Sequence, residues 1–305
     1  MKNIAITAIA LAAILLPASC GDSQEKRAGL PPGAIPFTYD SLIRIQGIIG
    51  EHNDCNLILG TGTSDLCIDM DYYIRHAAGI GMEDKVYKAF FLDSDSSLQS
   101  LWLIQDTTIS LDLGAARISC RGAAVLDLGS GSGSDGILGL GGLTGSPIEI
   151  NFGRSYLRRI TPEETDTAGG YTEVPIGIDE AGRLTAEMEM TVRDRTVRGT
   201  FILDTGKGGD VELSPAFAER QGLHRLYEAG KNMSPDAATA VIGKDTVRGI
   251  TVRWPAAATE AGETGDTGYA GSIGCGILSA FDIIIDFADS TMYLKPHGKN
   301  PAAGS

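Results

Sequence analysis

The feature that most limits the fold of this chain is an internal repeat. A strand-like hairpin leads into Gly60-Thr61-Gly62 in the first half and into Asp204-Thr205-Gly206 in the second half. A Gly-bearing apolar stretch and two further strand-like runs then follow in each half, in the same order. Ile150-Asn151-Phe152 in the first half matches Ile285-Asp286-Phe287 in the second half. Tyr156-Leu157-Arg158 likewise matches Tyr293-Leu294-Lys295. This repeated order, over halves of about 125 residues, indicates a duplication and therefore two related lobes.

The second triplet follows an apolar strand. Residues 187–192 alternate with a period of two, so Met188, Met190 and Val192 share one face of a predicted strand. Residues 196–203 are the predicted return strand, which delivers Asp204 directly after an apolar run. Because burying a lone charge is costly, a carboxylate at this point needs a reason. One reason is a carboxylate dyad, in which two acids share a proton and polarise a water molecule. The alternative is an ordinary Asp-containing turn.

Two short helices are predicted at matching places in the halves. Asp69 is placed to cap a helix that runs through residues 72–74 and closes at Gly79. Ser214 is the predicted N-cap of the second helix, with Pro215 at its first position and Gly222 at its end.

Composition favours a globular protein of short strands and excludes one class of partner. The chain has 43% hydrophobic and 21% charged residues, 40 glycines and only 6% aromatic residues. Abundant glycine with few aromatic residues favours many strands and turns over long helices. The net charge of −14 argues against nucleic-acid binding, because phosphate contacts need Lys and Arg.

The N-terminus predicts export and lipid anchoring. A short basic start precedes an apolar run over residues 4–16, which is too short to span a membrane as a mature helix. Small residues then precede Cys20, and this arrangement resembles the lipobox of bacterial lipoproteins. By that resemblance Cys20 carries the lipid that anchors the protein to a bacterial membrane, the outer membrane being the expected one. The alternative is an ordinary secretory signal. Residues 21–35 are predicted to be a tether between the membrane and the folded body.

Neither cysteine nor histidine spacing indicates a metal centre. Beyond Cys20 the cysteines are Cys55, Cys67, Cys120 and Cys275, for which an oxidising compartment permits disulfides without fixing the pairs. The four histidines are scattered, and no C-x-x-C or H-E-x-x-H motif is present.

A hairpin into Asp204-Thr205-Gly206, followed later by the apolar-Gly element Ile273-Gly274, resembles the pepsin/retropepsin-like aspartic peptidases, and the first lobe matches this pattern in part. The ending over residues 281–296 looks like the retropepsin-like lipoproteins of Bacteroidetes-type bacteria. The resemblance implies an all-β, bilobal acid-protease fold with two duplicated β-barrel-like lobes and few short helices. It also implies peptide-bond hydrolysis by an Asp-activated water in an interlobe cleft, without metal or organic cofactor.

The same resemblance implies the roles of the triplets and the domain plan. Asp204, Thr205 and Gly206 would be the catalytic triplet, and Gly60-Thr61-Gly62 would be its counterpart in the first lobe. The protein would be a monomer that binds a peptide or protein in its cleft. The expected parts are the signal peptide and lipobox 1–20, the tether 21–35, the first lobe 36–160, the second lobe 171–297 and a tail 298–305. Residues 160–170 are polar and turn-rich and are predicted to join the lobes.

The first triplet departs from the family pattern at its decisive position. Gly60 stands where the first lobe should supply its Asp, and Lys207 replaces a small residue after the second triplet. Three alternatives follow: an inactive member that binds peptides or proteins, a pairing of Asp204 with a carboxylate from elsewhere, or a pairing of two chains. The third is disfavoured because the first lobe already takes the partner's place.

Two further motifs are weighed against this interpretation. Asp266-Thr267-Gly268 follows no apolar strand and reads as a turn. Residues 125–133 are similar to the first motif of S-adenosylmethionine-dependent methyltransferases, with Glu149 at a tolerable distance for a ribose contact. Such a turn should open a helix, but the glycine-rich stretch from Asp135 to Leu143 has no helical stripe.

Overall fold

The fold is mostly β-structure, in a computed structural model that describes residues 29–50, 52–63, 66–80, 86–92, 98–129, 131–166, 169–223, 238–253 and 268–297. The predicted signal peptide with Cys20, Asp266-Thr267 and the tail 298–305 lie outside the described residues. Within the described ranges, no helix has the length and apolar character needed to cross a membrane.

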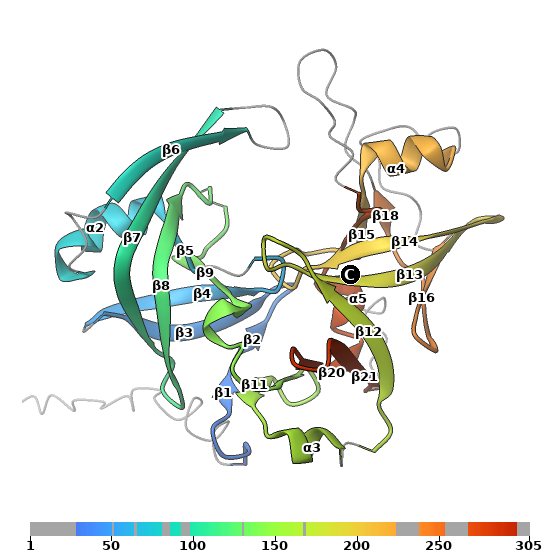
Figure 1. The fold of residues 1–305 in the computed structure, drawn as a ribbon, viewed down its shortest axis with the longest axis horizontal. Helices are drawn as coiled ribbons and strands as arrows, with labels where there is room; N and C mark the ends of the chain where they lie inside the picture. Colours follow the sequence, from blue (N-terminus) through green and yellow to red (C-terminus); the bar gives the residue numbers. More distant parts are fainter. Residues whose placement is uncertain are drawn as a thin grey trace, which may run out of the picture. The chain divides into compact units, whose positions relative to one another are not determined.

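The first lobe is an eight-stranded sheet in the order β2-β3-β4-β9-β5-β8-β7-β6 (Figure 1). Strand β3 also pairs with β7, which closes the strands between them into a barrel. The strands are β2 (Thr38–Tyr39), β3 (Ile43–Ile49), β4 (Asn53–Gly60), β5 (Leu66–Asp69), β6 (Val86–Leu92), β7 (Leu98–Asp112), β8 (Arg117–Leu126) and β9 (Gly136–Gly139). A 3-10 turn, η2 (Leu140–Gly142), follows β9.

The second lobe repeats this plan with strands in the order β12-β13-β14-β19-β15-β18, while β16 pairs with β13 and β17. Its strands are β12 (Thr172–Ile178), β13 (Leu184–Val192), β14 (Arg195–Leu203), β15 (Val211–Leu213), β16 (Ala238–Ile242), β17 (Asp245–Arg248), β18 (Val252–Arg253) and β19 (Gly271–Ile273). In both lobes one strand is inserted between two others: β9 lies parallel to β4 and antiparallel to β5, as β19 does to β14 and β15. The expected bilobal, duplicated β-fold is therefore confirmed.

A third group of strands joins the lobes. Hairpin β10 (Ile148–Asn151) and β11 (Tyr156–Arg159) from the first half pairs with hairpin β20 (Phe281–Asp286) and β21 (Thr291–Pro296) through β10 and β20. Strand β1 (Ile35–Pro36) adds to β11 at one side, and β21 continues into β12 at the other. These joining strands are continuous with the second-lobe sheet, while the eight strands of the first lobe form a sheet of their own.

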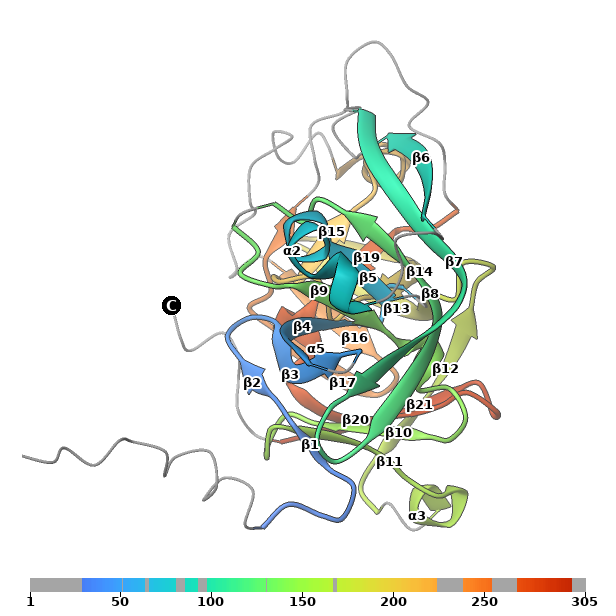
Figure 2. The ribbon, with the colours of Figure 1, turned by 90° about the vertical axis from the view of Figure 1, so that its left-hand side faces the viewer.

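Local sequence explains where the helices begin. Helix α2 (Met70–Ile80) starts where Asp69 Oδ1 accepts hydrogen bonds from the backbone N–H groups of Asp71 and Tyr72. Helix α4 (Pro215–Arg220) starts where Ser214 Oγ accepts from the N–H of Phe217. The helices follow β5 and β15 respectively, which extends the repeat, and α2 lies beside β5 (Figure 2). A further short helix, α5 (Cys275–Leu278), follows β19.

The segment that joins the lobes contains one structured element that we did not predict. Helix α3 (Pro162–Asp166) occupies part of residues 160–170. Thr161 Oγ1 accepts from the N–H of Glu164, and Glu164 Oε2 accepts from the N–H of Thr161 at 3.0 Å. This reciprocal pair is a capping box, which satisfies two backbone donors at the start of the helix.

Hydrophobic side chains follow the strand alternation into a continuous core. Met188, Met190 and Val192 are buried on one face of β13, as their spacing predicts. Tyr72 and Tyr73 of α2 are also buried, at 2% and 4% exposure.

The methyltransferase alternative requires a strand–turn–helix that this region lacks. After β8 and residues 127–129, the next regular element in the described part of the chain is strand β9. Glu149, the candidate for a ribose contact, is buried on β10 and accepts a hydrogen bond from Arg158 Nε at 2.7 Å. Neither the backbone nor this carboxylate is available for a cofactor of that kind.

Candidate functional site

The two triplets meet between the lobes through their threonines. Thr61 Oγ1 donates to the carbonyl oxygen of Leu203 at 2.7 Å, and Thr205 Oγ1 donates to that of Leu59 at 2.7 Å. Each hydroxyl also accepts from the backbone N–H of the other threonine, at 3.0 and 3.2 Å. Both threonines are buried, at 2% and 1% exposure. We refer to these four bonds as the threonine grip; they fix the two loops against each other.

Asp204 is placed by the strand that precedes it. Its backbone N–H donates to the carbonyl of Ile273 at 2.9 Å, which continues the pairing of β14 with β19 beyond Leu203. Its Oδ1 accepts from the N–H of Gly206 at 2.8 Å and from the N–H of Gly62, in the other lobe, at 3.2 Å. One carboxylate oxygen thus takes a backbone donor from each loop. Among the described residues, Oδ2 accepts no hydrogen bond, and Asp204 is half-buried.

The glycines around Asp204 leave no room for side chains. A Cβ added at Gly62 would lie 2.4 Å from Asp204 Cγ, and one at Gly206 would lie 3.2 Å from Gly60 Cα. The carboxylate therefore lies in the narrow space between the two loops. A larger residue at either position would displace it.

Gly60 packs against Ile137 of its own lobe and faces Gly206 of the other lobe. It pairs with Gly139 in the parallel β4–β9 ladder, and a Cβ built on it would lie 2.7 Å from Ile137 Cγ2. The branched side chain of Ile137 thus covers the position from which a first-lobe carboxylate would project. The absence of an acid at residue 60 is matched by packing, not by an empty space.

Replacing Gly60 with alanine should destabilise the protein by about 1–3 kcal/mol, because the new methyl group overpacks against Ile137. In urea titrations, the double variant Gly60→Ala/Ile137→Ala should lose less stability than the sum of the single variants, with a coupling of about 1 kcal/mol. Gly145→Ala is the control, since no atom lies within 4 Å of its Cβ position. Additive single effects would contradict this account of the packing.

Cys275 contacts the loop that carries the second triplet. This fully buried residue begins α5, and its Sγ donates to the carbonyl oxygen of Thr205 at 3.1 Å. Burial, with the nearby charge of Asp204, raises the pKa of the Cys275 thiol to about 12, so the thiol remains protonated and able to donate. The backbone of Cys275 is in turn held by Tyr39, whose hydroxyl donates to its carbonyl at 3.3 Å.

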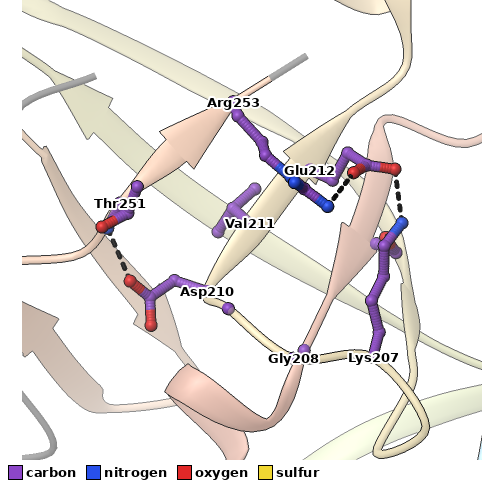
Figure 3. Close-up of a pocket in the computed structure, with 10 residues that line it drawn as sticks. Lys207, Gly208, Asp210, Val211, Glu212, Thr251 and Arg253 are labelled. Carbon is purple, nitrogen blue, oxygen red and sulfur yellow. Dashed lines mark hydrogen bonds and ion pairs between the residues drawn. The ribbon is translucent and has the colours of Figure 1, made fainter. Parts of the chain in front are cut away.

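A cavity of about 330 Å³ opens beside the loop that follows the second triplet (Figure 3). Lys207, Glu212, Arg253 and Ser272 line one part of it, and Asp210 and Thr251 line another. Burial raises the pKa of Asp210, which accepts a hydrogen bond from the N–H of Thr251 at 2.6 Å. We call this space the charged cavity.

In the described part of the chain, no three His, Cys, Asp or Glu side chains cluster as metal ligands would. His52 is exposed and His76 packs against the ring of Tyr72. His297 Nε2 lies 2.6 Å from the carbonyl oxygen of Ser279. His224 lies outside the described residues.

Comparison with known proteins bears on the fold. No protein-family model matches the sequence, and no curated protein matches it either. The crystal structure of the aspartic proteinase from Irpex lacteus matches 88% of this chain and 98% of its own, with a TM-score of 0.54 and 15% sequence identity. The chain has the bilobal fold of an aspartic proteinase. At this identity the similarity is one of fold, and in this chain the two triplets lie where the lobes meet.

Within the aspartic-proteinase fold, the structure brings together all six residues of the predicted triplets. It adds contacts that sequence reasoning missed: Ile137 against Gly60, Cys275 against Thr205, and the grouping of side chains in the charged cavity. The spacing of Cys275, directly after Ile273-Gly274, was the available signal for the second of these.

Proposed function

We propose that this protein binds peptides or extended protein segments over the two triplet loops without hydrolysing them. One observation carries the proposal: a single carboxylate oxygen, Asp204 Oδ1, accepts the backbone donors of both loops. In this arrangement Asp204 fills the space between the loops alone. The aspartic-proteinase fold supports a peptide as the ligand class.

Hydrolysis of the aspartic-peptidase kind needs two carboxylates with separate roles. One is ionised and takes a proton from water, while the other is protonated and donates to the scissile carbonyl. Gly60 supplies neither group, and Ile137 covers its position. Among the described residues, no second carboxylate is hydrogen-bonded to Asp204. Pairing of two chains is also disfavoured, because Thr61 already engages Thr205 within one chain.

Asp204 Oδ2 supplies the contact expected with a ligand. It is the carboxylate atom that the loops leave unused, and it can accept a hydrogen bond from a peptide N–H. A hydrogen bond to a charged acceptor contributes more than one between neutral groups. Asp204 therefore accepts a hydrogen bond from the backbone of the bound peptide and does not activate a water molecule.

The proposal includes where the protein acts. The lipobox-like sequence before Cys20 supports export and a lipid on that cysteine, so that a monomer would be tethered at the outer membrane. Metabolic labelling with a fatty acid, compared between the natural chain and Cys20→Ser, tests the anchor independently of the site.

Replacing Asp204 with asparagine should weaken peptide binding by about tenfold, since Oδ1 can still accept both loop donors while the outer atom becomes an N–H donor. Peptides selected from a displayed library of short random sequences provide the ligands, and fluorescence anisotropy measures their affinity. Asp289→Asn, at an exposed turn, makes the same chemical change elsewhere.

The same peptide library, incubated with the purified protein from acidic to neutral pH, should yield no cleavage products by mass spectrometry. Pepsin under identical conditions is the positive control. Cleavage that Asp204→Asn abolishes would overturn the non-catalytic proposal and point to a second carboxylate brought from elsewhere.

A further inference from the structure

The charged cavity lies on the same face of the second-lobe sheet as Asp204. Ile202, Ser272, Glu212 and Arg253 form one row across the neighbouring strands β14, β19, β15 and β18. Side chains alternate along a strand, and the pairing of β14 continues to Asp204, so Asp204 shares the face of Ile202. A ligand that lies over Asp204 and extends along this face of the sheet would reach the charged cavity.

The cavity carries two cations held by one carboxylate (Figure 3). Glu212 Oε1 pairs with Lys207 Nζ, and Glu212 Oε2 pairs with Arg253 Nη2 at 2.6 Å. Ser272 Oγ accepts from Lys207 Nζ at 3.1 Å. Because Glu212 uses a different oxygen for each partner, it fixes both cations, and the three side chains together keep a charge of about +1.

Donors remain in this cluster for a ligand. An arginine guanidinium has about five N–H donors. Within the described residues, only the pair with Glu212 engages Arg253, whose side chain is 52% exposed. Asp210 turns toward Thr251 and away from the cations (Figure 3), so its carboxylate does not occupy this part of the cavity. A cation cluster of this kind is a local exception on a chain of net charge −14.

We propose that the charged cavity receives a carboxylate of the bound peptide, which pairs with Arg253 and Lys207. The carboxylate can belong to an acidic side chain or to the C-terminus of the peptide, since both present the same group. A volume of about 330 Å³ is large enough for either. This inference rests on the proposed function and adds a ligand class to it: peptides with an acidic group at one position.

The test uses peptides selected from the random library against the purified protein. The tightest acidic peptide is compared with two matched forms, one with each acidic residue changed to its amide and one with an amidated C-terminus. We expect one of the two forms to lose about tenfold in affinity, and the form that does identifies the source of the carboxylate.

Arg253→Gln should abolish the difference in affinity between the acidic peptide and its matched neutral form. It should weaken binding of the acidic peptide by about tenfold and leave the affinity of the neutral form unchanged. Arg198→Gln is the matched control, because Arg198 also pairs with a glutamate at the surface but lies outside the cavity. The charge reversal Arg253→Glu should shift the preference toward peptides with lysine at the same position.

Each outcome decides between the two proposals. Peptides that bind tightly with no acidic preference, or an acidic preference that survives Arg253→Gln, would overturn the charged-cavity inference and leave peptide binding intact. A protein that selects no peptide at all would overturn the proposed function and this inference with it.

Discussion

Replacing Thr61 or Thr205 with valine is expected to lower the free energy of unfolding by about 2–6 kcal/mol in each case. Valine has nearly the shape of threonine but cannot hydrogen-bond. Thr61→Val leaves the carbonyl of Leu203 and the N–H of Thr205 without their partners in a buried place. An unsatisfied buried polar group costs about 1–3 kcal/mol, and each substitution creates two. Urea titration monitored by fluorescence gives the change, with the slope of the transition as a check that the unfolded state is unaltered.

The reciprocal arrangement of the threonine grip predicts a further result. Once one threonine is lost and the loops separate, the second contributes less, so the double valine variant should cost less than the sum of the two single variants. Thr61→Ser keeps the hydroxyl and should lose about 1 kcal/mol or less. Valine variants as stable as the serine variant would show that the grip does not hold the lobes together.

Arg158→Met is expected to lower the free energy of unfolding by about 3 kcal/mol, because it leaves Glu149 charged in the sheet that joins the lobes. Glu149 is buried, and Arg158 Nε lies 2.7 Å from its Oε2. Tyr156 donates to the other oxygen at 2.8 Å and moderates the loss. Burial and the bond to Glu149 raise the pKa of Tyr156 to about 12, so this donor persists throughout the usual pH range.

Two companion variants separate the buried charge from the surface charge. Arg158 also pairs with Glu164, which is 44% exposed, and Glu164→Gln should cost less than about 1 kcal/mol. Adding Glu149→Gln to Arg158→Met removes the unpaired charge and should restore part of the lost stability. A double variant that is less stable than Arg158→Met alone would mean that the buried carboxylate itself is not the source of the cost.

Much of the fold could be predicted because it depends on local patterns that occur twice. The alternation of residues 187–192, the cap at Ser214 and the pairing of Gly-Thr-Gly with Asp-Thr-Gly each need only a short stretch of sequence. The structure bears out the bilobal fold that these patterns predict. Helix α3 could also have been found, since Thr161 and Glu164 have the spacing of a capping box.

The rest of the site depends on contacts that no local pattern encodes. Asp204 accepts a hydrogen bond from the N–H of Gly62 only because the two loops approach closely. The local sequence of neither loop determines this approach. Glu212 and Arg253 are neighbours only because β15 runs parallel to β18, after a long intervening stretch of chain. Spacing alone permits a ribose contact for Glu149. Its actual partner, Arg158, becomes evident only once the register of β10 and β11 is known.

The pairing of a first-half hairpin with a second-half hairpin also sets the order in which the protein can be completed during synthesis. Strand β10 belongs to the first half but pairs along one edge with β20, which leaves the ribosome only after the whole second lobe has been made. Until then, the β10–β11 hairpin presents an open strand edge, which is a template for pairing with other chains. If the chain folds only after synthesis is complete, this interval is avoided, because both hairpins then become available for pairing at the same time.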